Sequence, residues 1–249
     1  MIKILLTGAD GAMGKTVIQV VEENKKFEIT SGISKNEILY GNFNIYDNFN
    51  KVKEKVDVVI DFSNRIILED ELNFCKKNSI PLVLATTGLT NEDFKKIDEF
   101  SKYFPILQSS NFSLGINVME KYIKYFAKAL SDFDIEIIEK HHNKKKDAPS
   151  GTAKMLFESI NSSRENSLFE VYSRNENEKE REKNEVGIFS LRGGTIAGEH
   201  EVIFAGNDEV ITIKHEAQSK KIFAQGALKA AEFLIEKENG IYNMKDFLK

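Results

Sequence analysis

The sequence predicts an α/β protein in which a doubly wound parallel sheet is followed by a second α/β domain with a mixed or antiparallel sheet. Up to about residue 112, short apolar runs alternate with amphipathic helical segments, which is typical of parallel strands joined by crossover helices. A glycine-rich loop joins the first of these strands to the first helix. Beyond that point the pattern changes to helices and strands of period two.

The first domain is expected to contain five strands and three helices. The first helix has apolar residues at Val17, Ile18 and Val21, a spacing that buries one face. The third strand is apolar along most of its length, as parallel strands covered on both faces usually are. We expect strands over residues 2–7, 27–33, 56–62, 80–85 and 106–108, and helices over 15–24, 67–78 and 91–102, the last with Asn91 as its N-cap.

The second domain is expected to begin near residues 112–118. The stretch 175–184 is almost wholly charged and is interpreted as a solvated loop or helix face. An amphipathic helix over 222–237, ended by Asn239-Gly240, is expected to return to the first domain, because the termini of a domain often lie close together. The other expected elements are helices over 117–130 and 151–161 and strands over 134–139, 187–191, 199–205 and 210–215. The predicted domains are therefore 1–112 with 218–249, and 113–217.

Composition excludes several classes of protein. The chain has 249 residues, of which 41% are hydrophobic and 30% charged, so wholesale disorder is excluded. Its net charge of −4 provides no general field for nucleic acid or an anionic membrane. No apolar run approaches the roughly 18–20 residues needed to span a bilayer. The single Cys75 cannot form an intrachain disulfide, and no signal-peptide pattern is present, so we expect a cytoplasmic protein.

The glycine loop supports three interpretations. Gly8, Gly11 and Gly14 lie between strand and helix, as in a Rossmann-type fold where a pyrophosphate rests on the helix N-terminus, although Asp10 stands where the usual motif has its middle glycine. The same segment is one residue from the phosphate loop of an NTPase, which needs Gly in place of Ala9, and Asp61 could then hold magnesium. The third interpretation is a glycine turn that only caps a helix.

The end of the second predicted strand bears on cofactor choice. A dinucleotide fold places an acidic residue there for the adenosine ribose, or a basic residue for a 2′-phosphate. This chain has Ser34-Lys35 and no carboxylate, which favours NADP(H). An ordinary surface lysine would explain Lys35 equally well.

A second group of polar residues indicates a site for a small acidic molecule. His141 and His142 are adjacent and are half of the chain's four histidines. Neighbouring residues on a strand point in opposite directions and Cys75 is the only thiol, so a metal site is disfavoured. A lysine run then leads into Pro149-Ser150-Gly151-Thr152, where a helix N-terminus with hydroxyls could bind a carboxylate or phosphate.

These residues resemble a known signature. His141-His142-x-x-Lys145-x-Asp147-Ala148-Pro149-Ser150-Gly151-Thr152-Ala153 is similar to that of the 4-hydroxy-tetrahydrodipicolinate reductase (dihydrodipicolinate reductase) family of lysine biosynthesis. Because similar pieces run in order along the whole chain, the resemblance decides against the NTPase. The pieces are Gly8-Ala9-x-Gly11-x-Met13-Gly14, Asp61-Phe62-Ser63, Thr86-Thr87-Gly88, Asn111-Phe112-Ser113-x-Gly115-x-Asn117, Arg192-Gly193-Gly194, Gly198-Glu199-His200 and Phe223-Ala224-x-Gly226-Ala227.

The resemblance implies NAD(P)H-dependent reduction of 4-hydroxy-tetrahydrodipicolinate to tetrahydrodipicolinate, without a metal, by a homotetramer built through the sheet of the second domain. His141 and Lys145 would move protons, and His142, Ser150, Gly151 and Thr152 would hold the carboxylates of this small dicarboxylate substrate. Three groups of residues would hold the cofactor: Gly8, Ala9, Asp10, Gly11, Ala12 and Met13 at the pyrophosphate, Ala85, Thr86 and Thr87 at the nicotinamide, and Ser109, Ser110, Asn111 and Phe112 at the junction between the domains.

The sequence departs from the family pattern at a few positions. Ala85 stands where many members have Gly, and Ser109-Ser110 stand where small apolar residues are common. Ser34 replaces the acidic residue of members that use NADH well, so we expect NADPH to be preferred over NADH. The alternatives are another two-domain nicotinamide dehydrogenase of amino-acid metabolism, which would lack the double histidine, and a non-catalytic dinucleotide-sensing regulator, which would need a DNA-binding element.

Overall fold

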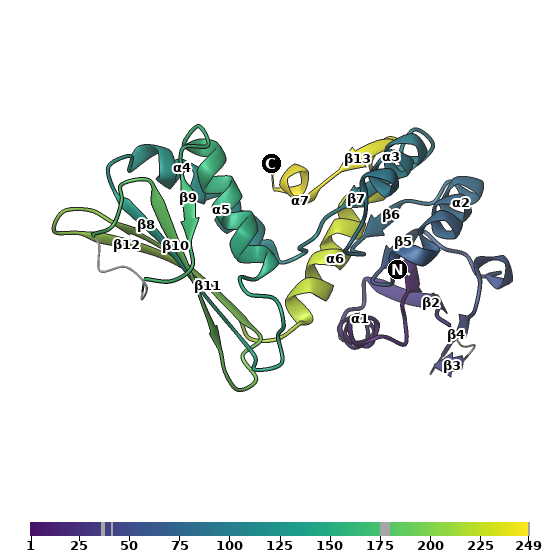
Figure 1. Cartoon of the computed structure of the whole chain (residues 1–249). Coiled ribbons are helices and arrows are strands. Elements are labelled where there is room, and N and C mark those ends of the chain that lie inside the picture. Colours follow the sequence, from purple (N-terminus) through teal and green to yellow (C-terminus); the bar gives the residue numbers. More distant parts are fainter. Residues whose placement is uncertain (36–37, 41, 175–179, 249) are drawn as a thin grey trace. The chain divides into compact units, whose positions relative to one another are not determined.

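The computed structural model describes residues 1–35, 38–40, 42–174 and 180–248 (Figure 1). Within these limits the chain forms two compact units. The first unit is Met1–Leu114 together with Lys220–Lys249, and the second is Gly115–Ser219.

The first unit is built on an eight-stranded sheet of order β13-β7-β6-β5-β1-β2-β4-β3. Every neighbouring pair is parallel except β3 and β4. Because β1 lies between β5 and β2, successive crossovers wind in both directions, which confirms the predicted doubly wound sheet. The strands are β1 (Ile2–Thr7), β2 (Phe27–Ile33), β3 (Ile38–Tyr40), β4 (Phe43–Tyr46), β5 (Val58–Asp61), β6 (Leu82–Leu84), β7 (Pro105–Gln108) and β13 (Gly240–Tyr242).

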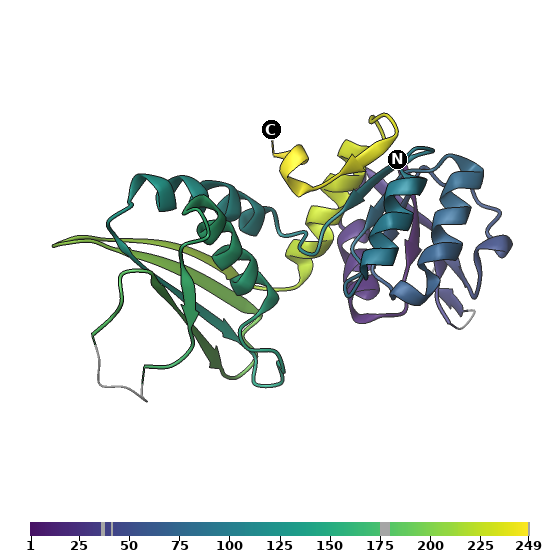
Figure 2. The same cartoon turned by 45° about the horizontal axis from the view of Figure 1, so that its top comes forward.

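Helices cover both faces of this sheet (Figures 1 and 2). Ile4 and Leu6 of β1 face a core formed with α1 (Ala12–Glu22) and α6 (Lys221–Leu234). Leu5 points the other way, into a core formed with α2 (Leu68–Asn78) and α3 (Asn91–Phe100). Three short helical segments complete the unit, namely η1 (Phe49–Lys51), η2 (Arg65–Ile67) and α7 (Met244–Phe247). The helix that we expected to return from the second domain is therefore part of this core.

Several details of the first unit differ from the sequence predictions. The strands β3, β4 and β13 were not predicted, and Gly240 begins β13 instead of only ending a helix. These strands have three or four residues each, too few for a periodic pattern to be recognised. The N-cap of α3 is Thr90 rather than Asn91, because the Thr90 hydroxyl accepts from the Asp93 N–H and the Asp93 carboxylate accepts from the Thr90 N–H.

The second unit has a mixed five-stranded sheet of order β12-β11-β8-β10-β9. The strand β8 pairs parallel with β10 and antiparallel with β11. One face packs against α4 (Leu114–Ala129) and α5 (Gly151–Ser163), with Ile137, Ile188 and Val202 at the centre of that core. The strands are β8 (Asp134–His141), β9 (Phe169–Val171), β10 (Glu185–Arg192), β11 (Gly198–Ala205) and β12 (Val210–Ala217). A mixed sheet was predicted, although β9 was not.

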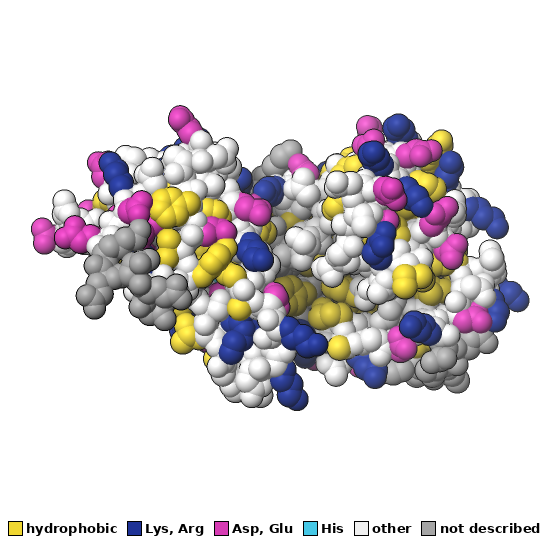
Figure 3. Space-filling model, in the orientation of Figure 1, with side chains coloured by type: hydrophobic (Ala, Val, Ile, Leu, Met, Phe, Trp, Pro, Cys, Tyr) yellow, Lys and Arg dark blue, Asp and Glu magenta, His cyan; other side chains and the backbone are white. Residues whose placement is uncertain are grey.

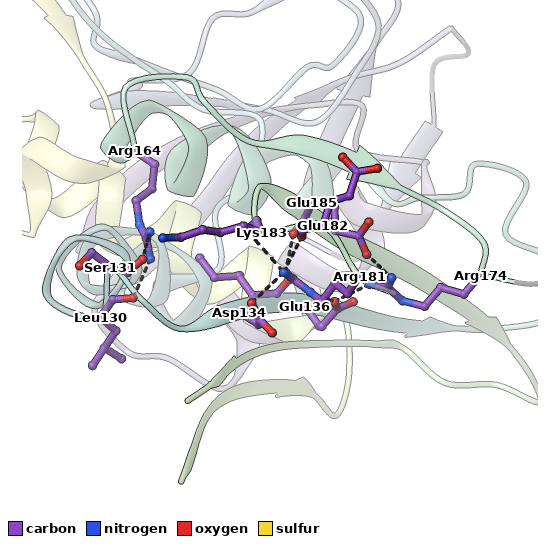
Figure 4. A network of polar contacts seen from close by, with 11 residues as sticks. Leu130, Ser131, Asp134, Glu136, Arg164, Arg174, Arg181, Glu182, Lys183 and Glu185 are labelled. Carbon is purple, nitrogen blue, oxygen red and sulfur yellow. Dashed lines mark hydrogen bonds and ion pairs between the residues drawn. The ribbon is translucent and has the colours of Figure 1, made fainter. Parts of the chain in front are cut away.

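Arginine side chains connect the loops of the second unit to neighbouring elements through hydrogen bonds and ion pairs (Figure 4). Arg164 donates to the carbonyl of Leu130 at 2.7 Å, just beyond the C-terminus of α4. Arg181 forms ion pairs with Asp134 at 2.8 Å and with Glu136 at 3.1 Å. The charged stretch 175–184 was interpreted as solvated. Its residues 175–179 lie outside the described part of the chain, residues 180 and 182–184 are exposed, and the half-buried Arg181 forms an ion pair with Asp134 of β8.

The surface carries charges of both signs. On the face shown in Figure 3, basic and acidic side chains are interspersed with small hydrophobic areas. Among the described residues, no helix is long and apolar enough to cross a membrane.

Candidate functional site

The glycine loop follows β1 and is too tightly packed to accept side chains at two positions. Gly8 has φ of +77°, and a Cβ there would lie 2.6 Å from the carbonyl oxygen of Phe62, just after β5. A Cβ on Gly14 would lie 2.2 Å from the carbonyl oxygen of Gly8. The glycines therefore let β1, β5 and α1 approach one another backbone to backbone.

The first turn of α1 is open to a ligand. Its N-cap, Gly11, makes no side-chain capping hydrogen bond, and Asp10, Gly11 and Ala12 are exposed. The first N–H groups of a helix have no partner within the helix and attract anions. The residues present thus fit a pyrophosphate, with Ala9 buried beneath the loop and Met13 half-buried beside it.

A cavity of about 350 Å³ in the first unit continues from this loop. Of the residues predicted to hold the cofactor, five line it: Met13, Ala85, Thr87, Ser110 and Phe112. Four other residues line it, Phe62, Ser63, Lys220 and Phe223, and none was given a cofactor role from the sequence, although all but Lys220 lie in pieces that resemble the family. Apolar and aromatic walls with a few polar groups suit a flat heteroaromatic ring.

The remaining predicted cofactor residues play different parts. Thr86 is buried, two residues beyond the end of β6. The Ser109 hydroxyl donates to the carbonyl of Asn111 at 2.9 Å, and the Asn111 side-chain oxygen accepts from the Ser113 N–H at 2.8 Å. Ser109 and Asn111 therefore brace the turn that carries Ser110 and Phe112.

At the end of β2, Ser34 and Lys35 differ in exposure. Ser34 is buried, its N–H donates to the carbonyl of Tyr46 at 2.9 Å, and its hydroxyl has no hydrogen-bond partner among the described residues. Lys35 is exposed, so its ammonium group is available to a ligand.

In the second unit, strand register gathers the polar residues at one end of the sheet. Because β8 and β10 are parallel, their last residues His141 and Arg192 are paired neighbours. Glu139 is paired with His200 across the antiparallel β8–β11 ladder. Side chains two residues apart on a strand share a face, so Glu139, His141, Arg192 and His200 all lie on one side of the sheet.

Glu139 is at the centre of this cluster and has no exposed surface. Arg192 donates to both of its carboxylate oxygens, at 2.6 and 2.8 Å. The Nδ1 atom of His141 lies 2.6 Å from Glu139 Oε2, and the N–H of Ser150 donates to Oε1 at 3.1 Å. Burial would raise the pKa of Glu139, but hydrogen bonds from Arg192, Ser190 and His141 outweigh it and lower that pKa to about 2.

The two neighbouring imidazoles are both held in the neutral form near pH 7. Burial lowers the pKa of His141, although its hydrogen bond to Glu139 opposes this shift. Burial lowers the pKa of His200 to about 3, with a smaller contribution from His141. The Ser150 hydroxyl lies 2.8 Å from His200 Nε2 and accepts from the Ala153 N–H at 3.1 Å, which caps α5.

Ser150 was predicted to hold a substrate carboxylate, and in the structure it caps α5 and contacts Glu139 and His200. It is 2% exposed, its hydroxyl is shared between His200 and the helix cap, and its N–H is used by Glu139. The next residue, Gly151, faces open space, since an added Cβ would meet no atom within 4 Å. In the first turn of α5, Gly151 is exposed and Thr152 is half-buried.

Lys145 lies on the loop between β8 and α5. Its ammonium group forms an ion pair with Asp147 at 2.8 Å, and the hydrogen bond lowers the pKa of Asp147. The backbone N–H of Lys145 donates to the carbonyl of His142 at 3.1 Å, so His142 and Lys145 belong to one turn. Arg192 ties this loop to the cluster by donating to the carbonyl of Asp147 at 2.7 Å.

Glu139, Arg192 and His200 were given no role from the sequence, although Arg192 and His200 lie in pieces that resemble the family. Glu139 precedes His141 by two residues on a strand, which could have placed it on the same face. Arg192 and His200 are brought in by pairing between distant strands, which the sequence does not reveal. Among the described residues, no group of three or more His, Cys, Asp or Glu side chains could hold a metal ion.

Two family models match nearly the whole chain. The model for the N-terminus of dihydrodipicolinate reductase matches residues 2–112, and the model for its C-terminus matches residues 115–248. Because these matches run through both units, they decide between the three interpretations of the glycine loop in favour of the dinucleotide.

Relatives and solved structures agree with this match. The 4-hydroxy-tetrahydrodipicolinate reductase of Caldanaerobacter subterraneus subsp. tengcongensis is 49% identical over 249 residues, covering 100% of this chain and 99% of its own. That of Rickettsia bellii is 42% identical, covering 100% and 95%. The structure of dipicolinate-bound dihydrodipicolinate reductase from Paenisporosarcina sp. TG-14 has the same fold, with a TM-score of 0.79 at 24% identity, covering 98% and 97% of the two chains.

Proposed function

The chain belongs to the dihydrodipicolinate reductase family, and we propose that it reduces 4-hydroxy-tetrahydrodipicolinate to tetrahydrodipicolinate in the diaminopimelate route to lysine. It is an NAD(P)H-dependent oxidoreductase. In the overall reaction, hydride from the cofactor and a proton are added while the substrate's hydroxyl group leaves as water. The observation that carries the proposal is the cluster of Glu139, His141 and Arg192 beside the N-terminus of α5, in a chain whose other unit has a dinucleotide loop.

The cofactor would be held by the first unit. The exposed first turn of α1 and the tight glycine loop would bind the pyrophosphate, as Gly8 to Met13 were predicted to do. The cavity lined by Ala85, Thr87 and Phe112 would take the nicotinamide. When bound, the nicotinamide supplies the hydride.

Two side chains of the second unit, His141 and Lys145, would accept or donate protons. Since an ionised carboxylate only accepts hydrogen bonds, the proton shared by Glu139 and His141 resides on Nδ1, which leaves His141 Nε2 as an acceptor toward substrate. Lys145 carries the ammonium group and would donate the proton to the carbon beside the one that receives hydride. The two groups therefore have opposite tasks, one accepting and one donating a hydrogen bond or proton.

The substrate carboxylates would bind at the start of α5. Gly151 and Thr152 offer first-turn N–H groups and a hydroxyl, and His142 adds a third donor on the preceding loop. Ser150 would hold a carboxylate as well, and it also caps α5 and links the helix to Glu139 and His200.

Three further properties belong to this proposal. NADPH would be preferred over NADH, because Ser34 and the exposed Lys35 follow β2, with no carboxylate there for the ribose. The chain would act as a homotetramer in the cytoplasm. The sheet face away from α4 and α5 would form the contact between chains, since it carries hydrophobic side chains including Leu191, which is 49% exposed.

The proposal is tested by following NADPH oxidation at its near-ultraviolet absorbance. The substrate is the freshly prepared condensation product of aspartate semialdehyde and pyruvate, and the controls omit pyruvate or replace Lys145 by Ala. We expect oxidation that depends on both precursors and on Lys145. An oxidation rate that is the same without pyruvate would refute the assigned substrate.

A further inference from the structure

We propose that Glu139 is a positioning residue that fixes the tautomer and direction of His141, and that Arg192 keeps Glu139 in the ionised form this task requires. The inference rests on the proposed function, because it assumes that His141 faces the substrate. Neither Glu139 nor Arg192 needs to touch substrate or cofactor for this role.

The hydrogen bonds of Glu139 determine which ring nitrogen of His141 carries the proton. Oε1 accepts from Arg192 and from the Ser150 N–H, at 2.6 and 3.1 Å. Oε2 accepts from Arg192 at 2.8 Å and lies 2.6 Å from His141 Nδ1. A carboxylate with these donors has no proton to give, so His141 must carry its proton on Nδ1 and present the lone pair of Nε2.

Arg192 stabilises the ionised form of the buried Glu139 carboxylate. A carboxyl group without exposed surface would ordinarily be protonated, and a protonated Glu139 could donate to His141 and reverse its tautomer. The guanidinium group stays charged and its fork matches both carboxylate oxygens. The same Arg192 group holds the Lys145 loop through the Asp147 carbonyl at 2.7 Å, so one side chain orders both proton-handling residues.

The far side of the imidazole is equally constrained. A Cβ on Gly198 would lie 3.0 Å from His141 Nε2 and 3.4 Å from Cδ2, so the ring lies directly over this glycine. The His200 ring stands edge-on at a centroid distance of 5.2 Å and 73°. Turning the His141 ring over would therefore require both the loss of the Glu139 contact and movement against β11.

The groups that set the charge on His141 come from four elements. Glu139 lies on the same strand, Arg192 on β10, His200 on β11 and Lys145 on the following loop. Burial lowers the pKa of His141, Glu139 opposes this, and Lys145 and Arg192 reinforce it. Removing the charge of Glu139 should therefore lower the pKa of His141 further and let the neutral ring adopt either tautomer.

The test compares Glu139→Gln with Glu199→Gln. Glu199 is a matched control, because it lies on the neighbouring strand and pairs with two cations, Lys140 and Lys214, each at 3.0 Å. Long-range ¹H–¹⁵N spectra of the ¹⁵N-labelled enzyme report each histidine tautomer, and His141→Asn identifies the signals of His141. The pH dependence of kcat and the Kd for NADPH are measured in parallel.

We expect His141 to be protonated on Nδ1 in the wild type and in Glu199→Gln. In Glu139→Gln we expect Nε2-protonated ring to appear and the acidic limb of the kcat profile to move to lower pH. kcat should fall about 10²-fold, with the Kd for NADPH changed less than about twofold. If Glu139→Gln does not fold because Arg192 is left unpaired, the double variant Glu139→Gln, Arg192→Gln removes both charges and should show the same tautomer change.

Three results would overturn the inference: an unchanged tautomer and pH profile in the Glu139 variants, the same losses in Glu199→Gln, or a wild-type ring protonated on Nε2. Failure of the proposed function is distinguishable from these. If His141→Asn turned over substrate normally, the role of His141 itself would be wrong. If His141→Asn were inactive while Glu139→Gln kept its tautomer, only the role of Glu139 would be wrong.

Discussion

Replacing Gly14 by Ala should abolish tight nucleotide binding while leaving the second unit unchanged. The new Cβ would lie 2.2 Å from the Gly8 carbonyl oxygen and 2.6 Å from that of Ala9. Both are backbone atoms, so α1 and the glycine loop must separate by about 1 Å to restore an ordinary contact. Hydrogen bonds to a charged group are worth roughly 1.5–3 kcal/mol each, so losing two of them weakens binding by about 3–6 kcal/mol. That corresponds to an increase in the Kd for NADPH of more than about 10²-fold.

The assay is a fluorescence titration with NADPH, accompanied by thermal unfolding. Gly193→Ala is the control, because a Cβ there would meet no atom within 4 Å and the residue lies in the second unit. Pyridine-2,6-dicarboxylate, a planar dicarboxylate, should bind both variants as it binds the wild type. A Kd for NADPH in Gly14→Ala within about threefold of the wild-type value would show that the loop does not hold the nucleotide.

Four other changes test other parts of the molecule. Lys145→Ala should lower kcat by about 10²–10⁴ with an unchanged Kd for NADPH, and near-native turnover would exclude it as the proton donor. Thr152→Val should lower kcat/KM about ten- to hundredfold and weaken competitive inhibition by pyridine-2,6-dicarboxylate, because it removes a hydroxyl donor to a charged group. We expect a preference for NADPH over NADH of about five- to fiftyfold in kcat/KM, shrinking at high salt and reversed in Ser34→Glu, Lys35→Ala; equal use of both cofactors at low salt would count against Lys35. Glu71 is fully buried, and burial and Asp61 raise its pKa well above the usual value, so the stability it contributes is present at low pH and is lost as pH rises through that raised pKa. The difference in Tm between Glu71→Gln and the wild type should therefore shift in favour of Glu71→Gln as pH rises above the usual glutamate pKa of 4.5, and parallel Tm curves would contradict this.

Local signals in the sequence predicted most of the first unit. The glycine loop, the apolar strands and the amphipathic face of α1 depend on residues close in sequence, and the structure confirms the doubly wound sheet. The short strands β3, β4 and β13 were missed because three or four residues carry no clear period. The capping residue Thr90 was mistaken for its neighbour Asn91, and only the reciprocal bond with Asp93 distinguishes them.

The candidate site was predictable only in part. His141 and Lys145 could be proposed from a short motif, and their roles remain predictions. The bond between Glu139 and Arg192 joins residues 53 positions apart, and it depends on the register of two parallel strands. Nothing local in the sequence fixes that register. The engagement of Ser150 with His200, 50 positions away, could not be predicted for the same reason.

The position of α6 has a consequence for how the protein is made. The first unit needs residues from both sides of the second, because Ala227, Ala231 and Leu234 of α6 pack against the same core as Ile4 and Leu6. During synthesis, the second unit is the first continuous stretch that is complete, while the nucleotide-binding sheet still lacks the helix that covers part of one face and the edge strand β13. Until α6 and β13 emerge from the ribosome, the part of the sheet face that α6 covers and the edge of β7 remain exposed, and they are open to aggregation or to chaperones.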